Sequence, residues 1–108
     1  MTDERLTTSE ALAELKDLLR LASTDEALQR LSATRYTRCR EVLLQSELRS
    51  ALPGFLRQCL THARFHDFIH LYSHDRAERL AFVEAALKPC ENRMGIRSTF
   101  DVFGDPDL

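Results

Sequence analysis

Apolar residues recur along this chain at three- and four-residue intervals, the spacing of an amphipathic helix, rather than in the alternation typical of a strand. The first stripe consists of Leu12, Leu15, Leu18, Leu19 and Ala22. Thr7-x-x-Glu10 just before it is a capping box, which predicts where this helix begins. Ser23-x-x-Glu26 is a second capping box, so we expect the chain to begin a new helix there.

Two further segments are predicted before the first proline. A short amphipathic helix would run to about residue 33 and would bury Ala27, Leu28 and Leu31. A separate segment from about residue 34 to residue 49 would then turn its own apolar residues inward: Tyr36, Cys39, Leu43, Leu44 and Leu48.

The stretch from Ala51 to Cys90 holds most of the aromatic residues and predicts three helices. The first would begin at Pro53, because the first position of a helix needs no backbone donor, and would bury Leu60 in its stripe. The third, with Ser73 as its cap and a stop at Pro89, is apolar over more than half its circumference, so we expect it to be central. The three helices are expected to bury one shared group of side chains: Phe55, Phe65, Phe68, Ile69, Leu80 and Leu87. Tyr72 extends the stripe of the second helix.

No alternating run of strand length appears before residue 98, and the chain has only three Gly and three Pro. These numbers are too small for a β fold with many turns. The sequence therefore predicts an all-α protein, a compact bundle of five to six short helices with an irregular C-terminal tail. The helical domain is expected to span residues 1–89. The tail, residues 90–108, would either pack on that domain or bind a partner through Phe100, Val102 and Phe103.

Length and composition indicate an ordinary globular domain: 108 residues, 44% hydrophobic and 30% charged. There is no run of 18 apolar residues and no apolar segment after a basic start, so neither a membrane span nor a signal peptide is expected. The three cysteines are odd in number and include no Cys-x-x-Cys pair. This pattern favours reduced thiols in a cytoplasmic protein over a disulfide framework.

Formal charge is distributed unevenly, although the net charge is only −2. Residues 1–29 carry three basic and seven acidic groups, whereas residues 30–64 carry seven arginines and two glutamates. A domain that binds nucleic acid without sequence preference would be basic overall, so the composition argues against that class.

The densest basic cluster consists of Arg35, Arg38 and Arg40 around Tyr36. Two interpretations remain open. The arginines could pair with the acidic first helix, or they could contact phosphates, together with Arg57, while Tyr36 stacks on a base.

All four histidines follow one another at intervals of four residues: His62, His66, His70 and His74. Neighbours at this spacing share a helix face and could bind one metal ion together. Each step of four residues advances about 40° beyond a full turn, however, so no more than two of the four could share an ion. We interpret the row as a polar, partly exposed helix face and expect no metal ion and no cofactor. No catalytic motif is present, and we expect no enzymatic activity.

Residues 36–89 resemble a small helical module that is found fused to bacterial abortive-infection (AbiJ-like) and other antiphage-defence proteins. The residues that carry the resemblance are Tyr36, Arg40, Leu43-Leu44, Leu52-Pro53-Gly54-Phe55-Leu56-Arg57-Gln58-Cys59, Phe65-His66-Asp67-Phe68-Ile69, Arg79, Phe82-Val83 and Ala86-Leu87-Lys88-Pro89. The resemblance implies a recruitment or assembly module. Such modules are usually joined to an effector, so it also implies a protein partner, either a larger effector chain or a second copy.

Taken together, these features lead us to expect a non-enzymatic interaction or adaptor subunit, an accessory component of a bacterial antiphage-defence system. The alternative is a nucleic-acid-binding regulator that uses the arginines between residues 35 and 57. The residues expected to contact a protein partner are Arg35, Arg38, Arg40, Phe100, Val102 and Phe103.

Overall fold

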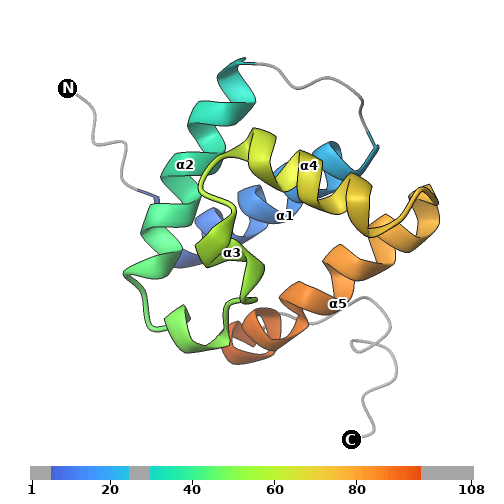
Figure 1. Ribbon diagram of the computed structural model, residues 1–108. Helices are drawn as coiled ribbons and strands as arrows, with labels where there is room; N and C mark the ends of the chain where they lie inside the picture. The colour runs from blue at the N-terminus through green and yellow to red at the C-terminus, as the bar shows by residue number, and fades with distance from the viewer. Residues whose placement is uncertain (1–5, 25–29, 96–108) are drawn as a thin grey trace, which may run out of the picture.

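The computed structural model describes residues 6–24 and 30–95, with the backbone alone for residues 30 and 31. Its helices, in chain order, are α1 (Thr8–Thr24), α2 (Arg30–Leu44), the 3-10 helix η1 (Arg49–Ala51), α3 (Phe55–Gln58), α4 (His62–Tyr72) and α5 (Arg76–Met94) (Figure 1). These residues contain no strand, which confirms the predicted all-α class. The expected partner-binding residues Phe100, Val102 and Phe103 lie outside the described residues.

Helix α1 is the centre of the bundle and packs against α2, α4 and α5 (Figure 1). Its apolar stripe is buried as predicted. The capping box at its start is confirmed, since the Thr7 N–H donates to Glu10 Oε1 at 3.1 Å and the Glu10 N–H donates to Thr7 Oγ1 at 3.0 Å. The expectation that the last helix is central was wrong. Only one narrow side of α5 is buried, while Phe82 and Ala86 on its other apolar side stay half-buried.

Helix α2 runs without a break through residues 33 and 34, so the predicted division into two helices was wrong. Tyr36, Cys39 and Leu43 are fully buried along one side of it, as the apolar spacing predicted. Ser23 does not begin a new helix, because its hydroxyl donates to the Leu19 carbonyl oxygen at 2.8 Å within α1. Ser23 is therefore not the helix cap that the second capping box predicted.

The helix predicted to begin at Pro53 is shorter than expected. Helix α3 is a single turn that buries Phe55 and Leu56, and Cys59 at its end is also buried. Leu60 follows after that turn, so it lies outside the stripe and is 54% exposed. Thr61 then begins α4, where its hydroxyl accepts a hydrogen bond from the Arg64 N–H at 3.1 Å.

Helix α5 starts beside its predicted position and ends well beyond it. Asp75, not Ser73, caps the helix, with its carboxylate accepting the Glu78 N–H at 3.0 Å. Pro89 does not stop the helix, although a proline inside a helix removes a backbone hydrogen bond and costs about 3 kcal/mol. Contacts beyond the proline offset this cost, since Cys90 is fully buried and Glu91 binds Lys16 of α1. The tail predicted from residue 90 thus begins inside a helix.

Gly95 ends α5 with a φ of 76°, a left-handed conformation that glycine adopts without strain.

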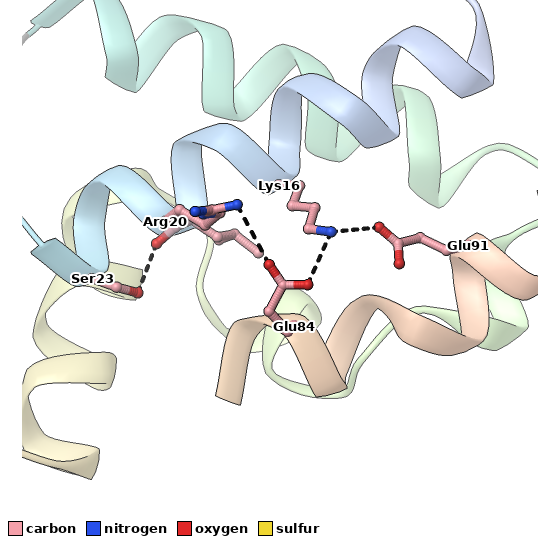
Figure 2. Close-up of polar contacts among 6 residues, drawn as sticks. Lys16, Arg20, Ser23, Glu84 and Glu91 are labelled. Atoms are coloured by element: carbon pink, nitrogen blue, oxygen red, sulfur yellow. Dashed lines mark hydrogen bonds and ion pairs between the residues drawn. The ribbon is translucent and has the colours of Figure 1, made fainter. Parts of the chain in front are cut away.

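Lys16 of α1 lies between two carboxylates of α5, with its Nζ 3.1 Å from Glu84 and 2.8 Å from Glu91 (Figure 2). Arg20 adds a longer contact of 3.5 Å to Glu84. These contacts fix the register of α5 against α1.

Four of the six residues predicted to pack together are buried: Phe55, Phe65, Ile69 and Leu87. Phe68 and Leu80 are only half-buried, so this part of the prediction was wrong. Arg79 takes the buried position next to Leu80, because its guanidinium reaches two backbone carbonyls in the interior. The ring of Phe68 lies at the margin of the core, between Phe55 and Phe82.

Candidate protein-interaction surface

Aromatic side chains of α3, α4 and α5 form a continuous group that runs from the core to the surface. Phe55 is buried, and its ring centroid lies 5.5 Å from that of Phe68 and 5.6 Å from that of Phe82. The Tyr72 ring lies 4.6 Å from Phe82 and is 53% exposed as a residue. We call Phe68, Tyr72 and Phe82 the aromatic face.

Leu71 enlarges this apolar surface, since it is 85% exposed and precedes Tyr72. Adjacent helical positions are about 100° apart, so a helix that buries one side cannot bury two such neighbours fully. Tyr72 was expected to point inward, and this was wrong. It is the last residue of α4, and its exposed side is not covered by any described residue. A large tyrosine next to a large leucine at a helix end was the signal in the sequence.

Two arginines of the basic cluster support the fold, whereas the third and the separate Arg57 are exposed. Arg35 pairs through Nε with Glu14 of α1, which is the expected pairing with the acidic first helix. Arg40 donates from Nε to the Leu56 carbonyl oxygen at 2.8 Å and from Nη2 to that of Arg57 at 3.3 Å, so it supports the α3 turn. Arg38 and Arg57 are exposed, and neither side chain bonds another described residue.

Tyr36, at the middle of that cluster, is fully buried and cannot stack on a base in this fold. Its hydroxyl donates to the Cys59 carbonyl oxygen at 2.6 Å, and its ring stacks on His62 with centroids 5.3 Å apart. Burial raises the pKa of the phenol above its usual value. Tyr36 thus joins α2 to the start of α4.

The histidine row is partly exposed, as the sequence suggested, except at its first member. His62 is fully buried and its Nε2 lies 2.7 Å from the Leu18 carbonyl oxygen. His70 is half-buried, with its Nε2 2.9 Å from the Ala22 carbonyl oxygen. Carbonyl oxygens accept, so each Nε2 carries the donated hydrogen. The row therefore connects α4 to the C-terminal half of α1, and only His74 is exposed.

The surroundings of His62 favour its neutral form in the folded protein. Its Nδ1 is buried without a hydrogen-bond partner, so a second proton there would create a buried, unpaired donor. Burial lowers the pKa of His62 below 6.5, chiefly by removing the charged form from water. The nearby charges of Arg35 and His66 act in the same direction.

We expect His62 to make stability fall as the pH decreases below 6.5. The unfolded chain takes up the proton there while the folded chain does not, so stability is complete above 6.5 and decreases towards the lower folded pKa. Each pH unit in that window removes up to about 1.4 kcal/mol. Urea denaturation between pH 7 and pH 5 should show a flatter curve for His62→Gln than for His74→Gln, an exposed control. Parallel curves for the two variants would contradict the assignment.

The three cysteines are free thiols buried in the core: Cys39, Cys59 and Cys90. Burial raises all three pKa values, that of Cys39 to about 11, so the thiol form dominates at neutral pH. In residues 6–24 and 30–95, no group of three His, Cys, Asp or Glu side chains is placed to hold a metal ion. An open hollow on the outer side of α4 is lined by His66, Asp67, His70 and Leu71.

Comparison of the chain with protein-family models, with curated proteins and with solved structures found no match. None of the helices in the described part of the chain is both long enough and apolar enough to span a membrane. The assignment of the candidate surface is therefore supported by geometry alone, namely by the aromatic face and the exposed Leu71.

Proposed function

We propose that this protein is a non-enzymatic interaction subunit that binds a protein partner through the aromatic face and Leu71. The observation that supports this is the exposure of Leu71 and Tyr72 at adjacent positions, with the Tyr72 ring in contact with an aromatic group that continues into the core. Aromatic residues that are anchored in this way are enriched among the residues that dominate binding energy. Contiguous apolar surface on a folded domain typically marks such a site.

We propose that the protein has an accessory role in a bacterial antiphage-defence system. The basis is the resemblance of residues 36–89 to the helical modules that are fused to such proteins. Eleven of the residues that carry the resemblance are buried, so they describe how such a module folds: Tyr36, Leu43, Leu52, Phe55, Leu56, Cys59, Phe65, Ile69, Arg79, Val83 and Leu87. The binding surface would then be the part that differs from one module to the next, which accords with an adaptor.

Nucleic-acid binding has less support from the arrangement of the arginines. Arg35 and Arg40 are engaged with Glu14 and with the α3 backbone, which leaves Arg38 and Arg57 for phosphates. Two cations can neutralise only about two phosphates, which gives a weak attraction.

The test is a binding measurement with the product of the neighbouring reading frame. The double variant Leu71→Ser/Tyr72→Ser should weaken binding at least about 30-fold, because residues that dominate an interface each contribute 2 kcal/mol or more. Its thermal transition should stay close to that of the wild type, since the two side chains are exposed. Leu60→Ser, which removes an exposed leucine before α4, is the matched control. Equal losses in both variants, or none in either, would contradict the proposal.

A further inference from the structure

We infer that the hollow on the outer side of α4 receives an arginine side chain of the protein partner. The inference deepens the proposed function and rests on it, because Leu71 belongs both to the hollow and to the proposed binding surface. It names the chemistry that the partner presents there, a planar cation on a flexible apolar stem.

The hollow adjoins the aromatic face on the same helix. Asp67 and Leu71 are four positions apart and form one row along α4. Phe68 and Tyr72 form the next row, about 100° further around the helix. The hollow has a volume of about 470 Å³, which is enough for one long side chain. A partner that covers Leu71 and Tyr72 would therefore also cover the hollow.

Asp67 supplies the negative charge of the hollow. Its side chain is 83% exposed, and its Oδ1 lies 3.9 Å from His66 Nδ1, too far for a hydrogen bond. Among the described residues, no lysine or arginine forms an ion pair with this carboxylate. Glu14, Glu84 and Glu91, in contrast, each bind a cation of another helix. A cation from the partner would supply the counter-charge that Asp67 lacks.

Two imidazole rings line the hollow in a fixed arrangement. The rings of His66 and His70 are stacked, with centroids 4.2 Å apart and planes 27° from parallel. His70 donates from Nε2 to the Ala22 carbonyl oxygen at 2.9 Å, which holds the ring against α1 and leaves Nδ1 as the acceptor of the neutral ring. A guanidinium stacks on planar rings and donates several hydrogen bonds at once, whereas an ammonium is a compact point charge. The rings therefore favour arginine over lysine.

Leu71 completes the lining and is 85% exposed. The methylene stem of an arginine can cover apolar surface while its charged head remains at a polar group. In the hollow, the stem would cover Leu71 and the head would reach Asp67. A purely apolar side chain would cover Leu71 equally well but would remove the Asp67 carboxylate from water without pairing it, which is costly.

The first test measures binding of the neighbouring gene product to variants of the hollow. Asp67→Asn keeps the size of the side chain and removes its charge, so it should weaken binding about tenfold, the effect of one lost hydrogen bond between charged groups. Glu41→Gln, which neutralises an exposed carboxylate of α2, is the matched control and should leave the affinity unchanged. Equal affinities of the two variants would overturn the inference.

The second test uses a small-molecule probe and needs no partner. Titration of the free protein with acetyl-arginine amide should shift the NMR signals of Asp67, His70 and Leu71 to saturation. The citrulline analogue has the same shape without the charge and should not do so, and neither probe should saturate Asp67→Asn. Absence of saturable shifts with the arginine probe, or equal shifts with both probes, would overturn the inference. A lysine analogue that binds as tightly would overturn the assignment to arginine.

The outcomes distinguish this inference from the proposed function. If Leu71→Ser/Tyr72→Ser weakens partner binding and Asp67→Asn does not, the proposed function stands and the inference fails. If Asp67→Asn weakens binding and the double variant does not, the inference stands, and the aromatic face is not the contact.

Discussion

Replacing Phe65 with alanine is expected to lower the free energy of unfolding by about 3–5 kcal/mol. Phe65 is fully buried, and its ring lies between those of Phe55, at 5.2 Å, and Phe68, at 6.0 Å. Alanine would leave a cavity among rigid rings that cannot collapse to fill it. Urea denaturation at pH 7 measures the loss.

Phe68→Ala is the matched control for this prediction, one turn along the same helix. Its side chain is half-buried and part of its surface already meets water, so its removal should cost clearly less. Equal losses for the two variants would contradict the arrangement in which Phe65 is interior and Phe68 belongs to the surface.

Arg79→Met is expected to cost about 3 kcal/mol. The guanidinium is largely buried, donates from Nε to the Ser23 carbonyl oxygen at 2.7 Å and donates from Nη1 to that of Ser73 at 3.1 Å. Ser23 lies in the last turn of α1, whose carbonyls lack partners within the helix. Methionine would fill the volume but leave both oxygens without these donors, and bonds from a charged donor contribute about 1.5–3 kcal/mol each.

The control for Arg79→Met is Arg76→Met, which changes an exposed arginine one turn earlier in α5. Its expected effect is below about 0.5 kcal/mol. Arg79→Lys should lie between the two, because an ammonium keeps the charge but not the planar pair of donors. An Arg79→Met variant as stable as Arg76→Met would show that these bonds do not hold α1 and α5 together.

Helix content could be predicted from the sequence wherever a stripe and a cap agreed. The stripe of α1 and its capping box specify where that helix begins and which side it buries, and the inward residues of α2 follow from spacing alone. Spacing does not reveal contacts between distant segments. Pro89 was expected to end a helix because local chemistry favours that, but Lys16, 75 positions from Glu91, holds the chain helical beyond it.

The polar interior was the part that sequence reasoning missed. A row of histidines has the same spacing whether it faces water or the backbone of another helix, and only the fold shows Leu18 and Ala22 opposite His62 and His70. Arg79 was assigned no role for the same reason. The aromatic face was predicted only in part. The wide apolar sector expected for the last helix includes Phe82, but the exposure of Tyr72 depends on where α4 ends relative to α5.

The central claim is that the aromatic face binds a protein partner, and hydrogen exchange on the complex tests it most directly. The reference is the free protein, measured under the same conditions. Binding of the neighbouring gene product should slow amide exchange in the second half of α4, around Phe68 and Tyr72, and around Phe82 in α5. The amides near Arg38 in α2 should be unaffected. Protection centred on Arg38 and Arg57, with the aromatic face unchanged, would contradict the account.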